Sequence, residues 1–502
     1  MIALHPALFE FLTLLVMGAS GVGLGVLFGW RHPLLLAGMA VGVSGSVRVL
    51  SALVVWSAGH PEWLIEAWWV ASVPLAAGAG VLAVRREARS TLLGGATFLG
   101  MAVVALAVKY VLDIGERHHR DSASMIELAQ LIFQIERDVS EAGGPEKRGL
   151  MYPLLLALGP EGRILSAATP LILLSIVALS VWLTLRLTAS VDRRFVWAGI
   201  GLVGLFSLTV PIARVALTYL NSHTMMALGV LALVGGVVLV RHAGRFTPSL
   251  TALLAIGVII GTTARIEGIV SVLVILASLV GSSVVRGIQA RVTVFSLVGL
   301  AGVSLAWWMS AYDSPVLTDF GVTSLAVAGV ALAGGALVAL PFVDRVRPWL
   351  FTITIAVVFG MILRVMIQSG NPFLLIDAQR TNVLLGYGGW GVAASALGAS
   401  LILLGWRARS ESYRRLAVMT VLLIFTMLVA KIFDGGGFGR EGFYDSVNRM
   451  WLHTIGVAAV TMAVGYAEVL QAAVRGSWPW SRRSLSAVYT SPENRSVEDA
   501  RS

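Results

Sequence analysis

Apolar runs of about 18 to 25 residues recur from one end of this 502-residue chain to the other. A helix needs about 20 apolar residues to cross the roughly 30 Å of hydrocarbon in a bilayer, so each run is long enough to span a membrane. The composition agrees, with 57% hydrophobic and only 13% charged residues, since soluble domains carry about a quarter charged residues. The sequence therefore predicts an all-α, polytopic transmembrane helical bundle.

We predict about fifteen membrane helices from the lengths of these runs. The predicted spans are 8–30, 33–57, 63–84, 91–112, 163–187, 195–213, 224–240, 248–264, 266–285, 292–311, 320–341, 348–368, 382–406, 413–433 and 449–470. The first run has no basic n-region before it, so it is predicted to be a retained span and not a signal peptide.

The charges of the loops predict the orientation of these helices. Every second loop is basic, for example Arg85–Arg89, Arg186–Arg194 and Arg407–Arg415, whereas intervening loops such as His60–Glu62 are poor in cations or acidic. Lys and Arg are retained on the cytoplasmic side, so the N-terminus is predicted outside and the C-terminus inside, with 471–502 as a disordered cytoplasmic tail. The net charge of +10 then reflects this bias and attraction to membrane lipids, and no nucleic-acid partner is expected. The chain has no cysteine, which excludes disulfides and thiolate metal sites.

One long polar segment, Asp113–Gly162, interrupts the apolar pattern and falls on the predicted outer side. Its middle, Ser122–Val139, has apolar residues on one helical stripe, which predicts a helix lying in the membrane interface. The pair Tyr152-Pro153 then leads into the apolar stretch Leu154–Leu158, where proline is suited to the first turn of a helix. Chemistry is expected in this segment, because the rest of the chain forms a hydrophobic frame.

Several ionisable residues fall near the outer ends of the predicted spans, at the level of this segment. They are Lys109, Arg214, Arg265, Glu267, Arg364, Lys431 and Asp434. Each one taken alone can be explained by a side chain that reaches the outer headgroups or by an ion pair, such as Arg265 with Glu267. Ionisable residues within a membrane are also functional candidates, and several cations at one depth are expected of a site that holds an anionic lipid headgroup.

The order of these features resembles the GT-C class of integral membrane glycosyltransferases, which includes protein mannosyltransferases and the enzymes that transfer aminoarabinose to lipid A. The matching features are an acidic residue after an outer helix end, an interfacial helix, a Tyr-Pro segment and a helix that ends in Arg. Here they are Asp113 or Asp121, then Met125–Ala129, then Gly149–Pro153, then Leu165–Arg186. Two further segments are similar to later ones in the class, Gly257–Gly268 and Asn448–His453.

The resemblance implies a GT-C-like catalytic region over 91–470, preceded by extra membrane helices within 1–90. It also implies a sugar donor carried on polyprenyl phosphate and a lipid, glycan or protein acceptor on the outer face. Cations would hold the leaving phosphate, and a carboxylate would take the proton of the acceptor hydroxyl.

For the carboxylate, Asp121 is the first candidate and Asp113 the second, although Asp121 is also well placed as a simple helix cap. For the donor, the candidate substrate-binding residues are Arg265, Arg449, Arg364, Arg214, Glu267 and Tyr152. A divalent cation is a further possibility, with His118, His119 and Glu116 as its ligands, and the alternative for them is a hydrated loop.

Other classes of protein fit the same composition. A transporter or lipid flippase would place its ionisable residues near the bilayer midplane, in Gly- or Pro-broken helices of two related halves. A polymerase or ligase of lipid-linked glycans would share the carrier lipid, but its largest outer loop is expected nearer the C-terminus. A structural or assembly protein of the cell envelope is a fourth hypothesis.

Overall fold

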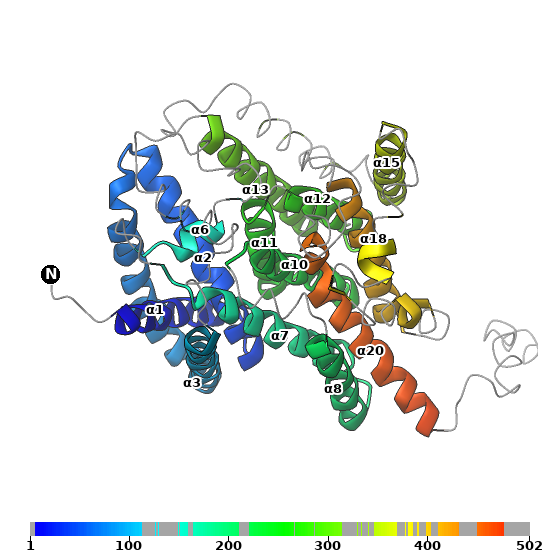
Figure 1. The fold of residues 1–502 in the computed structure, drawn as a ribbon, viewed down its shortest axis with the longest axis horizontal. Helices are drawn as coiled ribbons and strands as arrows, with labels where there is room; N and C mark the ends of the chain where they lie inside the picture. Colours follow the sequence, from blue (N-terminus) through cyan, green and yellow to red (C-terminus); the bar gives the residue numbers. More distant parts are fainter. Residues whose placement is uncertain are drawn as a thin grey trace, which may run out of the picture.

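The computed structural model consists of helices packed around a buried centre (Figure 1). It describes residues 6–112, 126, 129, 149, 151–158, 164–209, 220–265, 267–285, 287–313, 329, 333, 340, 346–368, 377, 380–384, 389–390, 398–402, 410–430 and 449–475. The α-helices are α1 (Pro6–Leu27), α2 (Pro33–Ser57), α3 (Leu64–Leu112), α6 (Met151–Leu156), α7 (Ala168–Leu187), α8 (Arg193–Thr209), α10 (His223–Ala243), α11 (Pro248–Thr263), α12 (Glu267–Val280), α13 (Ile288–Asp313), α15 (Arg347–Gln368), α18 (Glu411–Ala430) and α20 (Ile455–Val474). Short turns of other helix types are η1 (Pro61–Trp63), η4 (Arg380–Leu384) and η6 (Trp451–Thr454).

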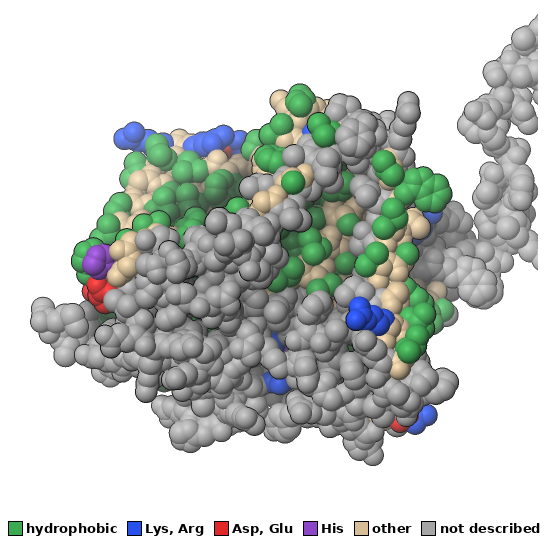
Figure 2. Space-filling view, turned by 90° about the horizontal axis from the view of Figure 1, so that it is seen from above, with side chains coloured by type: hydrophobic (Ala, Val, Ile, Leu, Met, Phe, Trp, Pro, Cys, Tyr) green, Lys and Arg blue, Asp and Glu red, His purple; other side chains and the backbone are tan. Residues whose placement is uncertain are grey.

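The described part of the chain confirms the prediction of an all-α fold and is compatible with a membrane protein. Six of its helices are long and apolar enough to cross a bilayer. Large apolar side chains are exposed on them, for example Val54 and Val70, and Figure 2 shows hydrophobic side chains on part of one face, beside a row of Lys and Arg. An apolar surface of this extent is expected to face lipid. The count of about fifteen helices and a GT-C-like arrangement stay predictions.

Helix α3 is a folded pair of helices and not one straight rod. Its 49 residues would reach roughly 73 Å at 1.5 Å per residue. The backbone leaves the helical conformation at Glu87 (φ −152°, ψ 67°), and Glu87 pairs with Arg31, just beyond the end of α1, at 3.0 Å. Trp69 and Lys109 come from the two opposite ends of α3, yet both contact the first turns of α1. The two halves are therefore antiparallel, as the two separate spans predicted for this region require.

The core is centred on α10, which is buried along its apolar length and lies beside α11 in the middle of the bundle (Figure 1). Small residues allow the two helices to approach each other closely. A Cβ atom on Gly257 of α11 would lie 2.9 Å from the backbone nitrogen of Leu233, and one on Gly229 of α10 would lie 2.6 Å from the side chain of Ile260. Close approach through small residues is typical of helix pairs in membranes, where there is no hydrophobic driving force between helices.

Contacts at one end of the bundle, here called the arginine end, join helix ends that were predicted to be cytoplasmic. The indole nitrogen of Trp30, after α1, donates to the carbonyl of Ser249 at the start of α11 (2.8 Å). The backbone N–H of Asp192, before α8, donates to Gln471 near the end of α20 (2.7 Å). The Arg31–Glu87 pair lies at this end as well.

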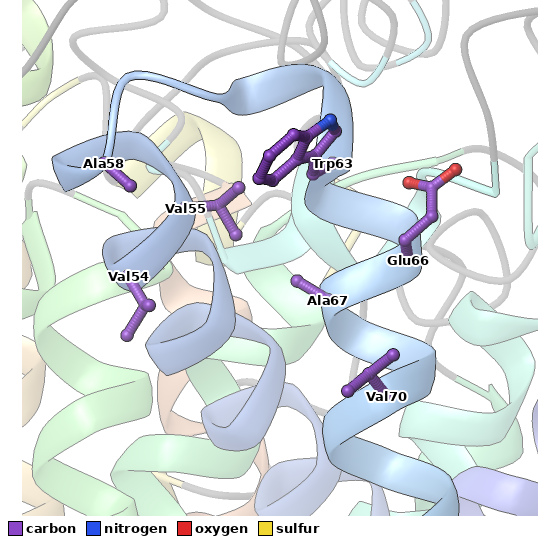
Figure 3. Close-up of a pocket in the computed structure, with 7 residues that line it drawn as sticks. All are labelled: Val54, Val55, Ala58, Trp63, Glu66, Ala67 and Val70. Carbon is purple, nitrogen blue, oxygen red and sulfur yellow. The ribbon is translucent and has the colours of Figure 1, made fainter.

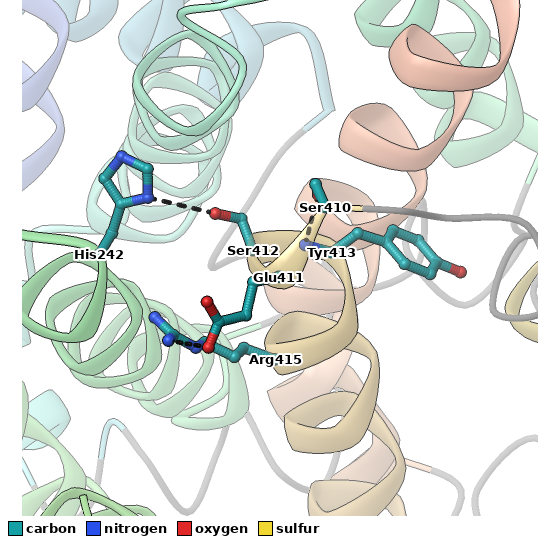
Figure 4. A network of polar contacts seen from close by, with 6 residues as sticks. All are labelled: His242, Ser410, Glu411, Ser412, Tyr413 and Arg415. Atoms are coloured by element: carbon teal, nitrogen blue, oxygen red, sulfur yellow. Dashed lines mark hydrogen bonds and ion pairs between the residues drawn. The ribbon is translucent and has the colours of Figure 1, made fainter. Parts of the chain in front are cut away.

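The start of α18 belongs to the same arginine end (Figure 4). Ser410 accepts a hydrogen bond from the backbone N–H of Tyr413 (3.0 Å), which is the usual role of a serine at a helix N-cap. Ser412 lies 3.4 Å from the ring of His242, at the end of α10, and Arg415 pairs with Glu411 one turn earlier. These contacts attach α18 to the C-terminal end of α10.

The opposite end, here called the loop end, gathers the helix ends that were predicted to be outside. It holds the starts of α1, α7, α10 and η6 and the ends of α2 and α11, which the contacts described below join together. Helix ends next to the basic loops thus lie at the arginine end, and helix ends next to the other loops lie at the loop end, as the alternation of loop charges predicts. Which membrane face each end occupies stays a prediction.

Candidate anion-binding site

The segment from Gly149 to Leu158 lies at the loop end and is held tightly against α11. Gly149 has φ +64°, and a Cβ atom there would collide with the backbone of Ala264 and Thr263. Only glycine adopts this left-handed conformation without strain and also leaves room for such an approach. Helix α6 follows, with all its residues buried, and a bridge between Ala157 and Ile164 turns the chain back toward α7.

Tyr152, a predicted substrate-binding residue, is fully buried at the start of α6. Its hydroxyl is hydrogen-bonded to the hydroxyl of Thr169, in the first turn of α7, and to the backbone of Asn221, before α10. Burial raises the pKa of Tyr152, an effect larger than the opposing effect of these hydrogen bonds. The phenol therefore stays protonated and joins α6 to two helix starts.

Arg265, the first candidate for binding the donor phosphate, is buried at the end of α11. Its Nη1 atom donates to the hydroxyl of Ser222, immediately before α10, at 3.0 Å. Its carbonyl accepts a hydrogen bond from the N–H of Gly268 (3.1 Å), so the chain turns sharply from α11 into α12. The guanidinium also lies close enough to His453 to act on it electrostatically.

A pair of buried histidines completes this group of residues. Nδ1 of His223, the first residue of α10, lies 2.9 Å from Nε2 of His453 in η6. The two rings are stacked, with centroids 5.1 Å apart and an angle of 29° between their planes. We call the set Tyr152, Ser222, His223, Arg265 and His453 the buried polar cluster.

Residues at three helix starts contribute to the buried polar cluster or contact it. Thr169 lies in the first turn of α7, His223 begins α10, and His453 lies in η6, which continues directly into α20. Backbone N–H groups at a helix start have no partner within the helix, and with the helix dipole they attract anions by about 0.3–1 kcal/mol each. A guanidinium and helix starts are groups that bind anions in proteins, so the buried polar cluster is a candidate anion-binding site.

The structure places the other predicted site residues differently. Arg449 is partly buried, one helical turn before His453. Arg364 is exposed on α15, which packs mainly against α12 and α18 and not against the cluster helices. Glu267 begins α12, and its side chain is outside what the structure describes. Asp113, Glu116, His118, His119, Asp121 and Arg214 lie outside the described residues.

Only two residues of the predicted interfacial helix are described, Ile126 and Ala129. Both are helical, and Ala129 is buried in the main core. Within the described residues, no group of three or more His, Asp or Glu side chains could hold a metal ion. The predicted ligands of a divalent cation fall outside that part of the chain.

Two further buried charges lie at the loop end. Lys109, at the end of α3, pairs with Glu10 of α1 at 2.7 Å, and the Glu10 side chain is only 6% exposed. Arg48 of α2 is 1% exposed. Its Nη2 atom donates to the carbonyl of Ala157, and its guanidinium lies over the ring of Trp68, 4.6 Å from the centroid. Arg48 thus holds the far end of the Gly149–Leu158 segment.

A surface groove of about 560 Å³ lies between the end of α2 and the start of α3 (Figure 3). Its lining is apolar except for Glu66, whose carboxylate points away from α2 in Figure 3. Val54 and Val70 in this lining are among the most exposed apolar side chains of the described residues. The groove therefore belongs to the apolar surface that is expected to face lipid.

Sequence reasoning singled out Arg265 and Tyr152 but missed His223 and Ser222. The signal available for them was the polar run Asn221-Ser222-His223 directly before a long apolar helix, on the predicted outer side. His453 lies in the segment that resembles the C-terminal part of the GT-C class, but it had no predicted role. No protein-family profile, no curated protein and no solved structure matches this chain.

Proposed function

We propose that the protein is a GT-C-like glycosyltransferase that moves a sugar from a polyprenyl-phosphate donor to an acceptor on the outer face of the membrane. One observation carries the proposal. Three segments that resemble the GT-C class, far apart in sequence, meet at the loop end. Gly149 packs on Ala264, beside Arg265, and Arg265 donates to Ser222, next to His223, whose ring contacts His453. A resemblance that rested on composition alone would not require them to meet.

The guanidinium and the helix starts in the buried polar cluster fit the chemistry of such a donor. In the reaction, the oxygen of the acceptor hydroxyl forms a bond to the anomeric carbon while the bond from that carbon to the phosphate oxygen breaks. The phosphate leaves with the bonding electron pair, and its negative charge is stabilised by Arg265 and the helix starts around it. The acceptor proton passes to a carboxylate, for which Asp121 and then Asp113 are our candidates.

A divalent cation bound by His118, His119 and Glu116 would add a second positive charge for the phosphate. The acceptor in this proposal is a lipid, a glycan or a protein, since the described residues favour none of them.

The test is incorporation of labelled sugar from polyprenyl-phosphate donors by membranes that contain the protein. Arg265→Ala is expected to lower the efficiency of donor use about 10- to 150-fold, the equivalent of the roughly 1.5–3 kcal/mol of a hydrogen bond to a charged group. If Asp121 is the base, Asp121→Asn is expected to abolish transfer. If Asp113 is the base, Asp113→Asn is expected to abolish it. Arg194→Ala is the control, because Arg194 is exposed at the opposite end of the bundle.

Normal transfer by the Arg265, Asp121 and Asp113 variants would refute the assignment of these residues to the site. If the native protein transfers no sugar from any such donor, the proposal that it is a glycosyltransferase is refuted. If labelled donor lipid moves across the bilayer of proteoliposomes and no new glycosidic bond forms, the protein is a flippase and not a transferase. Extension of a lipid-linked glycan by many units would indicate a polymerase.

A further inference from the structure

One ring nitrogen of the histidine pair in the buried polar cluster has no partner within the part of the chain that the structure describes. His453 is 0% exposed. Its Nε2 atom faces Nδ1 of His223 at 2.9 Å, whereas its other ring nitrogen, Nδ1, has no hydrogen-bond partner among the described residues. Most buried polar atoms have a hydrogen-bond partner, so a buried ring nitrogen without one is a candidate for contact with a bound water or ligand.

The short distance between the rings restricts where the protons are. If both rings carried protons on both nitrogens, two N–H groups would face each other and no hydrogen bond could form. One ring must therefore donate and the other accept. When His223 donates from Nδ1 to Nε2 of His453, the proton of a neutral His453 is on Nδ1, and this Nδ1 atom is an N–H donor.

A bound anion would favour this tautomer. Arg265 donates to Ser222, the residue before His223, so a positive charge lies beside the histidine pair. A ligand drawn there by positive charge is an anion, which accepts hydrogen bonds and donates none. Only the tautomer with N–H on Nδ1 offers such a ligand a donor.

We infer that His453 donates a hydrogen bond from Nδ1 to an oxygen of a phosphate group bound in the buried polar cluster, and that His223 is a positioning residue that fixes the His453 tautomer. The identity of this phosphate as that of a polyprenyl carrier rests on the proposed function. The hydrogen-bond assignment itself rests on the contact between the two rings, on the Nδ1 atom without a partner and on an anionic ligand, and it applies to any phosphate bound beside Arg265.

The two nitrogens of each ring are distinguishable by substitution. The amide nitrogen of Asn occupies nearly the position of Nδ1 of histidine, and that of Gln nearly the position of Nε2. His453→Asn therefore keeps the donor toward the ligand. His453→Gln lacks that donor and keeps only the contact with His223, with its amide turned so that the oxygen takes the Nε2 position and accepts from His223. For His223 the bonded atom is Nδ1, so His223→Asn keeps the donor to His453 and His223→Gln removes it.

The experiment measures binding of a polyprenyl phosphate, and separately of inorganic phosphate, to the purified full chain in detergent. Native protein, His453→Asn and His223→Asn are expected to bind with affinities within a few-fold of one another. His453→Gln is expected to bind about 10- to 150-fold more weakly, and His223→Gln to be weakened in the same direction. Binding of the lipid alone would identify a lipid headgroup as the ligand, and binding of both would identify phosphate itself.

A second measurement guards against simple misfolding. In protein labelled with 15N at histidine, the nitrogen spectrum distinguishes Nδ1–H from Nε2–H, and phosphate is expected to shift the Nδ1–H signal of His453. Equal binding by the Asn and Gln variants of His453, a reversed order, or an unshifted His453 signal in phosphate-bound native protein would overturn the assignment. Because binding is measured without sugar transfer, failure of the transferase assay would leave this result standing.

Discussion

Gly149 offers the sharpest test of how the Gly149–Leu158 segment is attached to α11. We expect Gly149→Ala to destabilise the protein by two separate effects. A left-handed conformation costs a residue with a Cβ atom about 1–2 kcal/mol. The new atom would also collide with the backbone of Ala264 and Thr263, and overpacking of this kind costs about 1–3 kcal/mol. The expected loss is therefore about 2–5 kcal/mol.

Gly244 provides a matched control, because it has nearly the same backbone conformation and open space around it. Its φ is +68°, and nothing lies within 4 Å of a Cβ atom built there. Gly244→Ala should thus show the conformational cost alone, about 1–2 kcal/mol. Equilibrium unfolding of both variants in mixed micelles, followed by circular dichroism, measures the difference. Equal losses for the two variants would refute the packing of Gly149 against α11.

Three further predictions concern other parts of the loop end and the topology. Lys109→Met should cost about 3–5 kcal/mol of stability by leaving Glu10 buried without its partner, and unfolding measurements should find the double variant Lys109→Met, Glu10→Gln more stable than the single one. Trp68→Ala should cost about 3–5 kcal/mol, since it removes a buried ring and its contact with Arg48, and a loss under about 1 kcal/mol in the same assay would contradict that packing. Because the chain has no cysteine, single cysteines report topology directly: in intact cells an impermeant maleimide should label Glu62→Cys but not Arg89→Cys, and the opposite pattern would reverse the predicted orientation.

The helices were predictable because the length of an apolar run directly reflects the thickness of a bilayer. Helix α2 has the predicted bounds, 33 to 57, and α11 begins where Thr247 caps a helix with proline in its first turn. The packing partners of each helix could not be predicted in the same way. They depend on close contacts between particular surfaces, such as Gly257 against Leu233, and hydropathy does not carry that information.

The candidate site was predictable only in part. Arg265 and Tyr152 stood out because a charge at a membrane helix end and a Tyr-Pro pair are unusual in so apolar a chain. His223 and His453 are 230 positions apart, and neither differs in sequence from an ordinary histidine at a membrane interface. Their role depends on a contact that only the tertiary structure creates. The roles of Asp113 and Asp121 stay predictions.

The hydrogen bond from Arg48 to Ala157 joins residues 109 positions apart, which has a consequence for how the chain is made. At about 5–20 residues per second, the ribosome needs roughly 5 to 20 s to synthesise the residues between them. Throughout that interval α2 carries a guanidinium whose carbonyl partner does not yet exist, in a helix where arginine is unfavourable by up to about 3.5 kcal/mol. Trp68, in the next helix, becomes available much sooner. The first helices of the nascent chain are thus held in the bilayer by their apolar residues and this ring, and they reach their final arrangement only after the Gly149–Leu158 segment has been synthesised.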